Sequence, residues 1–283
     1  MGYLLVTRQR PFLVIAAIFL VAATFVSAKN VDGEKWTLIS TGLYYGEFEA
    51  LDKSPVGDSK IRILKIDPKL YSFHMANASA PGEGGLMSVR KWSKKQNYVA
   101  AINAGLYQAD HKTSISLMKN NSHINNRSMN KQKTIFAFAP KKKGPPEATI
   151  FDRECDDIRS LKKEYLVYAQ SIRMISCKGK NVWKLQKETY STAAIATDKQ
   201  GNILFIHVRS PYATHKLINS LLKLPLNIRT AMYVEGGPQA QMYVNSSEKE
   251  YILLGRYRSE NAGKAISYFG WPIPNVIGIR KRK

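Results

Sequence analysis

Hydrophobic and polar residues alternate along two neighbouring segments in the first third of the chain. IRILKID (61–67) and YSFHMA (71–76) place apolar side chains at about every second position. This alternation is typical of β-strands with one buried face. Because only Pro68, Lys69 and Leu70 separate the two segments, the pattern predicts a hairpin of two strands.

Other short apolar segments predict further strands. The turn residues 198–201 lie between TAAIAT (192–197) and NILFIHV (202–208), which predicts a hairpin. LVYAQSIRMISC (166–177) and VWKLQ (182–186) flank the turn KGKN and predict another. The remaining predicted strands are YVAAIN (98–103), TIFAFA (134–139), AMYVE (231–235) and PNVIGI (274–279).

Two segments have helical spacing instead. Residues 88–96 place Val89 and Trp92 on one face, and residues 214–224 carry several leucines before Pro225. Strands clearly outnumber helices, and no linker or internal repeat divides the chain. The sequence therefore predicts an α+β fold, with a single domain built on large mixed β-sheets and a few helices.

The first 28 residues resemble a signal peptide. Arg8 and Arg10 precede a run of apolar and small residues at 12–26, and small residues follow at 26–28. The run is short for a membrane-spanning helix, although an uncleaved anchor is the alternative. We therefore expect residues 1–28 to be removed, and residues 29–283 to form a periplasmic or secreted domain.

The chain is strongly basic, with a formal net charge of +22 at pH 7. Such a surface favours anionic partners. Because the expected export argues against nucleic acid, sugar phosphates, anionic glycans and lipid head groups are the better candidates. A basic surface without a specific partner is the alternative, since the lysines are scattered along the chain. The oligomeric state is left open.

Cys155 and Cys177 are the two cysteines of the chain. In an oxidising compartment they predict one disulfide, and two separately buried thiols are the alternative. No CxxC spacing or neighbouring histidine supports a metal site, so we expect no metal and no cofactor.

Two strand ends carry the residues best suited to chemistry. AAINAG (100–105) ends a strand with Asn103 before Ala104 and Gly105, and MYVEGGP (232–238) ends one with Glu235 before two glycines. Polar strand ends followed by small residues often line ligand sites, because glycine lets the backbone approach a ligand closely. Each motif alone is also explained by an ordinary turn.

Together these motifs carry a resemblance. AAINAGLYQAD (100–110), STAAIATDKQGNILFIHV (191–208) and MYVEGGPQAQMYV (232–244) occur in the order found in the phosphodiester glycosidase domain family. The chain resembles this family over roughly residues 60–279. The family often has aspartate where this chain has Glu235. The resemblance implies hydrolysis of a sugar-1-phosphodiester that releases the sugar from its phosphate.

The resemblance also suggests roles for the strand-end residues. We expect Glu235 to be catalytic, as nucleophile, general base or electrostatic stabiliser of positive charge at the anomeric carbon. We expect Asn103 to orient a sugar hydroxyl or a phosphate oxygen, with a loop cap as the alternative. The backbones of Gly105, Gly236 and Gly237 are expected to lie against the substrate, with N–H groups facing the phosphate.

Cationic side chains should also hold the phosphate. Arg173 and Arg209 are the candidates, although Arg173 also fits the solvent face of a strand. His207, two residues before Arg209, is a further substrate-binding candidate, and a buried core histidine is the alternative. Asp110 follows the Asn103 loop and is interpreted as a turn residue rather than a second catalytic carboxylate.

Two other functions fit the same sequence. The first alternative is a periplasmic binding protein without catalysis that holds an anionic glycan or lipid head group in the same pocket. The second is a secreted nucleic-acid binder, which rests on charge alone. We favour a secreted hydrolase of sugar-phosphate diesters that acts in envelope or exopolysaccharide metabolism.

Overall fold

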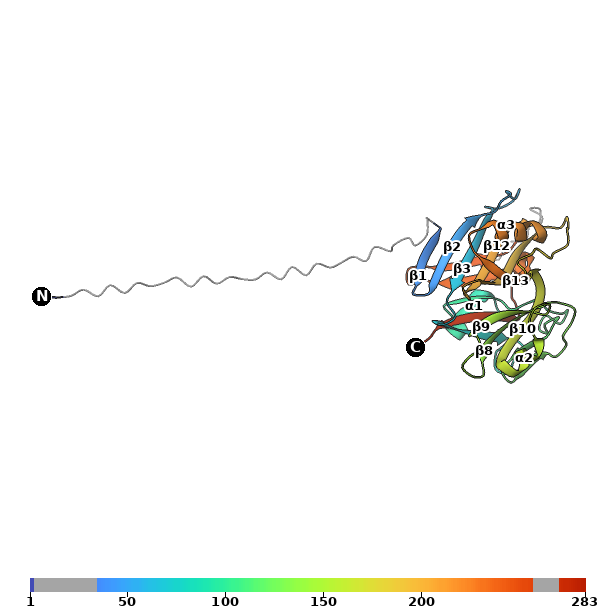
Figure 1. The fold of residues 1–283 in the computed structure, drawn as a ribbon, viewed down its shortest axis with the longest axis horizontal. Coiled ribbons are helices and arrows are strands. Elements are labelled where there is room, and N and C mark those ends of the chain that lie inside the picture. Colours follow the sequence, from blue (N-terminus) through green and yellow to red (C-terminus); the bar gives the residue numbers. More distant parts are fainter. Residues whose placement is uncertain (3–34, 257–269) are drawn as a thin grey trace.

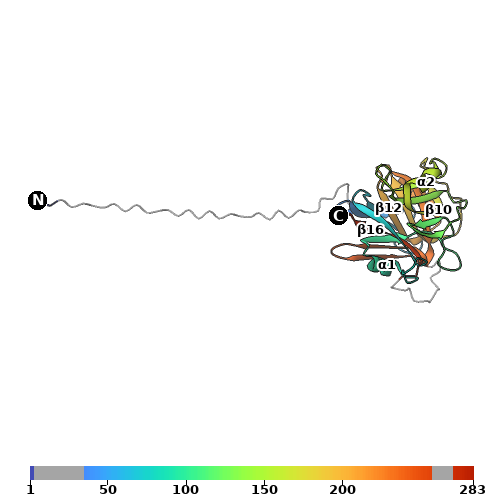
Figure 2. The same cartoon turned by 90° about the horizontal axis from the view of Figure 1, so that it is seen from below.

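The computed structural model describes residues 1–2, 35–256 and 270–283. Within these residues two β-sheets face each other, and helices lie against their outward faces (Figures 1 and 2). Every strand pairing among these residues is antiparallel. The α+β class is confirmed, whereas the sheets are antiparallel rather than mixed.

The larger sheet contains, in spatial order, β1 (Trp36–Ser40), β2 (Leu43–Glu49), β3 (Lys60–Ile66), β12 (Ile203–Tyr212), β11 (Tyr190–Asp198), β13 (Ile228–Gly236), β10 (Tyr165–Ile175), β6 (Met118–Asn120) and β7 (His123–Asn126), with β8 (Thr134–Pro140) and β9 (Ala148–Asp152) continuing it beside β10. The smaller sheet contains β15 (Glu250–Leu254), β14 (Gln241–Asn245), β5 (Ala100–Asn103), β16 (Asn275–Lys281) and β4 (Tyr71–Asn77). The helices are α1 (Val89–Gln96), α2 (Ile158–Glu164), α3 (Thr214–Lys223) and the 3-10 turn η1 (Gly237–Gln239).

The main hydrophobic core lies between the two sheets. Phe205 and Met232 from the larger sheet belong to the same buried cluster as Phe73, Ile102 and Ile277 from the smaller sheet. Burial of these inward faces is the dominant favourable term in the folding of such a sandwich.

Helices cover the outward faces. α3 buries Leu217 and Leu221 in a second cluster with strands of the larger sheet. α1 begins at Ser88, whose side chain accepts the Lys91 N–H, and buries Trp92 against the smaller sheet. These two helices confirm the helical prediction for residues 88–96 and 214–224, and α2 had not been predicted.

The first predicted hairpin is wrong, although both of its strands exist. β3 pairs with β2 and β12, whereas β4 pairs with β16 in the other sheet. Leu64 of β3 and Phe73 of β4 face the same core from opposite sides. A tight turn, in which the N–H groups of Leu70 and Tyr71 donate to Asp67 O, carries the chain from one sheet to the other. The alternating pattern was right, but the strands meet face to face instead of edge to edge.

The second predicted hairpin is only half formed. β10 covers its first strand, but residues 182–186 make no strand, and only a single bridge joins Ile175 to Asn181. Leu185 is 82% exposed, and Trp183 packs against the core cluster without belonging to a strand. The hairpin predicted around residues 198–201 is confirmed, because β11 and β12 pair directly.

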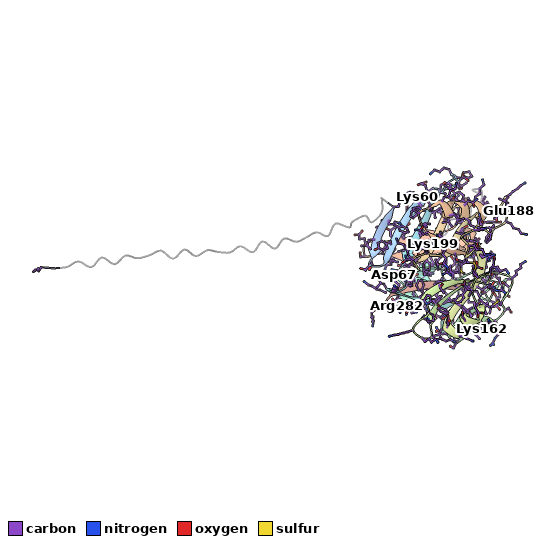
Figure 3. The ribbon with its side chains drawn as sticks, viewed as in Figure 1. Lys60, Asp67, Lys162, Glu188, Lys199 and Arg282 are labelled. Carbon is purple, nitrogen blue, oxygen red and sulfur yellow. A yellow bond between two sulfur atoms is a disulfide. The ribbon has the colours of Figure 1, made fainter. Side chains whose placement is uncertain are left out.

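Charged side chains are spread over the described surface. In Figure 3, Lys60 lies near the top of the molecule and Lys162 near the bottom, with Lys199 between them. The predicted signal peptide depends on residues 3–28, which lie outside the described residues. No helix within the described part of the chain has the length and apolar character needed to cross a membrane.

Candidate functional site

Glu235 lies at the end of β13, where the larger sheet meets the η1 turn. In the register with β11, Glu235 is opposite Ala193, and Gly236 is opposite Thr192. The Glu235 residue is only 7% exposed. Pairing with a central strand therefore holds this carboxyl in a largely dry position.

Burial dominates the electrostatics of Glu235. Its Oε1 accepts the Gly236 N–H at 2.9 Å, and no described lysine, arginine or histidine forms an ion pair with it. Burial raises the pKa of Glu235 to about 8, and the Gly236 N–H opposes this shift only in part. The carboxyl is mostly protonated at neutral pH, and its pKa is close to the value that suits proton transfer there.

The glycines after Glu235 let the turn pack without overlap. A Cβ on Gly236 would overlap the Tyr233 hydroxyl, and a Cβ on Gly255 would overlap the Gly237 carbonyl. Gly237 also has φ +61°, a conformation that favours glycine. The Gly236 N–H already donates to Glu235, so it is not available for the anion-binding role expected from the sequence.

Asn103 fastens this turn to the smaller sheet. Its Nδ2 donates to Gln239 O at 2.9 Å, and its Oδ1 accepts the Gln241 N–H at 2.7 Å. The residue is 2% exposed and both ends of its amide are used. The structure thus favours the loop-cap interpretation of Asn103, in which the side chain positions the turn.

His207 supports the same turn from β12. Its Nε2 lies 3.2 Å from Ala240 O, and the side chain is fully buried. Burial lowers the pKa of His207 to about 4, so the ring is neutral at pH 7. The geometry fits the core-histidine alternative better than contact with substrate.

A cavity of about 370 Å³ opens beside Glu235. Its lining consists of Tyr190, Tyr233, Glu235, Gly236, Gly237, Pro238, Gln239 and Arg256. The Tyr233 phenol is buried, and the pKa of this group is raised by burial and then by the nearby charge of Glu235. The cavity therefore combines a proton-donating carboxyl, aromatic walls and a cation.

Tyr107 approaches the same carboxyl from the loop after β5. Burial raises the pKa of the Tyr107 phenol, and the charge of Glu235 raises it further, while a hydrogen bond with Gln239 opposes both. A bridge between Tyr107 and Ser114 holds the loop in place. Tyr107 is thus a neighbour of the site that the sequence had not singled out, although it is not among the residues that line the cavity.

A family model described as phosphodiester glycosidase matches residues 96–280. This range spans more than half of the chain and includes Asn103, Tyr107 and Glu235. The chain belongs to the phosphodiester glycosidase family. The resemblance seen in the sequence motifs is therefore confirmed.

Two solved structures are similar to this family member in fold. One is the catalytic domain of zebrafish N-acetylglucosamine-1-phosphodiester alpha-N-acetylglucosaminidase, auto-inhibited by its pro-peptide, with TM-score 0.59 and 16% identity over 86% of this chain and 85% of that one. The other is a hypothetical protein from Synechocystis, with TM-score 0.54 and 14% identity over 86% of this chain and 63% of that one. No curated protein sequence matches the chain.

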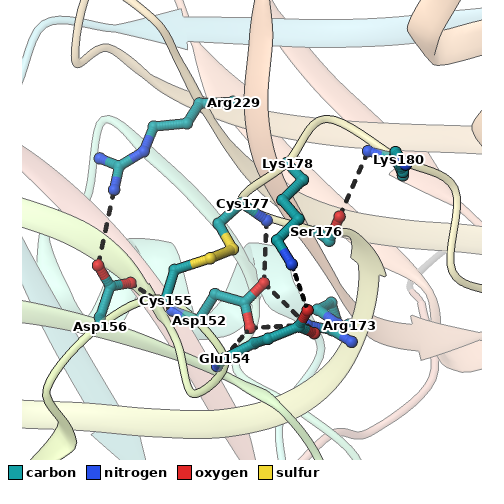
Figure 4. The surroundings of a disulfide bond; sticks show 10 residues. All are labelled: Asp152, Glu154, Cys155, Asp156, Arg173, Ser176, Cys177, Lys178, Lys180 and Arg229. Atoms are coloured by element: carbon teal, nitrogen blue, oxygen red, sulfur yellow. Dashed lines mark hydrogen bonds and ion pairs between the residues drawn. A yellow bond between two sulfur atoms is a disulfide. The ribbon is translucent and has the colours of Figure 1, made fainter.

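In this member of the family, Arg173 does not line the cavity beside Glu235. Its Nη1 lies 2.8 Å from Asp152 Oδ1 and 2.7 Å from Glu154 Oε2, as Figure 4 shows. Two carboxylates therefore already neutralise this arginine. The structure assigns Arg173 to an ion-pair network rather than to the phosphate.

The predicted disulfide is confirmed next to that network. Cys155 and Cys177 are bonded, with their Cα atoms 6.5 Å apart (Figure 4). Asp152 Oδ2 also accepts the Cys177 N–H at 2.9 Å. The bridge therefore fastens the segment after β9 to the segment after β10.

Three other predicted residues lie at or beyond the edge of the site. Arg209 is exposed and does not line the cavity, although its carbonyl accepts the Ser191 hydroxyl near the cavity wall. Gly105 has φ +134°, which a side chain would strain, and it begins the loop that carries Tyr107. Asp110 accepts N–H groups of Lys112 and Thr113, which fits its interpretation as a turn residue.

The described residues contain no group of three or more histidine, cysteine, aspartate or glutamate side chains arranged to hold a metal ion. The chemistry on view in the cavity is that of one carboxyl, phenols, an amide and a guanidinium. These groups suit proton transfer and anion recognition.

Proposed function

We propose that this protein is a hydrolase that cleaves the glycosidic bond of a sugar-1-phosphodiester. The observation that carries the proposal is Glu235, a buried carboxyl without a cationic partner, in the wall of a cavity of about 370 Å³. Membership of the phosphodiester glycosidase family supports the same reaction class.

In this reaction Glu235 acts as a general acid. The bond between the anomeric carbon and the phosphate oxygen breaks, the electron pair stays on that oxygen, and Glu235 gives its proton to it. Water supplies the new hydroxyl of the sugar, and the proton that this water releases restores the Glu235 carboxyl. A carboxyl that is protonated at neutral pH is suited to protonate the departing oxygen. The raised pKa of Glu235 therefore shifts its role from the nucleophile or base considered for the sequence to an acid.

The phenols around Glu235 complete this part of the site. Tyr233 lines the cavity beside Glu235, the charge of Glu235 acts on the phenols of both Tyr107 and Tyr233, and burial is what raises the pKa of the carboxyl. Tyr190 is 40% exposed at the cavity mouth, where its ring offers a surface on which a sugar can stack.

We further propose that the enzyme acts outside the cytoplasm on an envelope or exopolysaccharide component. The Cys155–Cys177 disulfide and the signal-like residues 1–28 support this location.

The test compares the wild type with Glu235→Gln on a panel of sugar-1-phosphodiesters, with released free sugar as the readout. We expect the variant to lose about 10²- to 10⁴-fold in kcat, the usual contribution of general acid–base catalysis. Glu248→Gln is the matched control, because Glu248 is exposed at the turn after β14. This control should retain wild-type activity.

Two results would contradict the proposal. Wild-type activity in Glu235→Gln would remove the carboxyl from the reaction. No turnover by the wild type, together with thermal stabilisation by the same phosphodiesters, would instead support the non-catalytic binding protein.

A further inference from the structure

Arg256 supplies the positive charge of the cavity. It lies two residues after the end of β15, and it is the one lysine or arginine among the described residues that line the space beside Glu235. A phosphodiester carries one negative charge, and an arginine guanidinium recognises phosphate oxygens through a planar fork of N–H donors. Arg256 therefore offers the cavity a phosphate-binding guanidinium. Arg173 and Arg209, which were predicted for this role, do not line the cavity.

The guanidinium of Arg256 is free of carboxylate partners within the described part of the chain. Arg62 and Arg173 are also partly buried, and each of them pairs with two carboxylates. Arg256 is only partly exposed and forms no such ion pair. A half-buried cation without a counter-ion is favourably placed to receive an anionic ligand.

The backbone of Arg256 is fixed against the catalytic turn. Its N–H donates to Ser191 Oγ at 3.0 Å, and the preceding Gly255 N–H donates to Ala240 O at 2.7 Å. Gly255 packs so closely on Gly237 that a Cβ would overlap its carbonyl. The start of the arginine side chain is therefore held beside the turn that follows Glu235.

Arg256 and Glu235 act on the cavity separately. Burial raises the pKa of Glu235, the Gly236 N–H opposes this rise in part, and no arginine contributes to the shift. The guanidinium therefore has no carboxylate partner in Glu235 and is available to another group. A substrate with an anion next to a glycosidic oxygen matches this pair of groups.

We propose that Arg256 binds the phosphodiester group of the substrate and makes the enzyme select phosphodiesters over neutral glycosides. This inference rests on the proposed function for its substrate class. The guanidinium N–H groups hold the non-bridging phosphate oxygens, and the glycosidic oxygen then lies toward Glu235. The residue is a specificity determinant as well as a binding group.

The first experiment measures binding without turnover. Dimethyl phosphate and inorganic phosphate are titrated into the wild type, Arg256→Lys and Arg256→Gln by calorimetry at one ionic strength. We expect Arg256→Gln to weaken binding about 10- to 100-fold, the range for a hydrogen bond to a charged group, with Arg256→Lys between.

Arg229→Gln is the control for the loss of one positive charge. Arg229 lies on the same strand as Glu235, six residues earlier, which places it about 20 Å away along the strand. It should bind dimethyl phosphate as the wild type does. Equal affinity in Arg256→Gln and the wild type, or no affinity in the wild type, would overturn the inference.

The second experiment measures selectivity. Each variant is given a sugar-1-phosphodiester and a neutral aryl glycoside of the same sugar. Arg256→Gln should lower kcat/KM for the phosphodiester about 10- to 100-fold and leave the neutral glycoside unchanged, by the same hydrogen-bond range. An equal loss on both substrates would mark Arg256 as structural and contradict the inference.

The two experiments also separate this inference from the proposed function. Arg256-dependent binding of dimethyl phosphate without hydrolysis of any phosphodiester would refute the hydrolase and support the anion site. Phosphodiester hydrolysis at the same rate in the wild type and Arg256→Gln would support the hydrolase and refute the role of Arg256 as the anion site.

Discussion

The protein buries two carboxyl groups in opposite ways. Asp152, at the end of β9, is fully buried and accepts hydrogen bonds from Arg173 Nη1 at 2.8 and 3.0 Å and from the Cys177 N–H at 2.9 Å. Glu235, at the end of β13, is 7% exposed and accepts one hydrogen bond, from the adjacent Gly236 N–H. Both side chains end strands of the same sheet, yet only the first has a cation.

This difference distinguishes a structural carboxylate from a carboxyl that is a candidate for catalysis. A buried carboxylate that is surrounded by donors ties elements together, as Asp152 joins β9, β10 and the disulfide (Figure 4). A buried carboxyl without a cation holds a proton instead. Strongly perturbed groups of the second kind in a cavity are candidates for catalysis.

The largest effect on stability should come from breaking the Asp152 network. Asp152→Asn removes the negative charge opposite Arg173, and loss of one partner of a buried ion pair costs about 3–5 kcal/mol. We expect urea unfolding to report that loss, while the folded fraction keeps its activity.

Glu154→Gln is the matched control for Asp152→Asn. It removes the other, solvent-exposed carboxylate of the same arginine, so its effect on stability should be far smaller. Equal stability of Asp152→Asn and the wild type would show that the buried pair does not hold the fold.

The pH dependence of stability should reveal Glu235, the buried carboxyl without a cation. The pKa of Glu235 is raised from 4.5 in the unfolded chain to about 8 in the fold. The folded protein therefore binds the extra proton between these values, and the free energy of unfolding falls as the pH rises from about 5 to about 8. The integrated change is on the order of 4 kcal/mol.

Glu235→Gln should remove this slope, since glutamine does not titrate. Denaturant unfolding of both proteins at several pH values between about 5 and 8 measures the difference. Parallel curves for the wild type and the variant would mean that Glu235 ionises normally in the fold.

Removal of the disulfide should cost slightly less than the Asp152 change. The bond joins residues 22 positions apart, and the chain-entropy model gives about 3 kcal/mol for such a loop. The double variant Cys155→Ser, Cys177→Ser should melt at a lower temperature and retain activity below its transition. A loss of activity in the folded variant would connect this region to the cavity.

Asn103→Asp should have the smallest effect on stability but a marked effect on the reaction. The new carboxylate accepts the Gln241 N–H yet repels Gln239 O, which leaves a buried acceptor without a donor at a cost of about 1–3 kcal/mol. Displacement of the turn should lower kcat with little change in the affinity for dimethyl phosphate. A change in that affinity alone would instead place Asn103 on the phosphate, as the sequence first suggested.

Much of the architecture could be predicted from the sequence, because it depends on local pattern. The alternation in IRILKID and the leucine spacing before Pro225 identified β3 and α3 correctly. Alternation does not show which partner a strand takes. For that reason β3 and β4 were predicted as a hairpin, although they face each other across the core.

The candidate site was predictable only in part. The strand-end motif identified Glu235, and the order of the motifs identified the family. Arg173 was predicted to hold the phosphate. Its ion pairs could not be predicted from the sequence, because Asp152 and Glu154 lie about 20 residues away along the chain. No sequence motif pointed to Arg256, since only the pairing of β14 with β15 brings it beside the turn after Glu235.

The most direct test of this account is the pKa of Glu235 in the folded protein. Carbon NMR of labelled glutamate side chains across a pH titration measures it, with Glu235→Gln to assign the resonance. The account predicts a midpoint of about 8. A midpoint near 4.5 would contradict it, because Glu235 would then be an ordinary carboxylate at neutral pH.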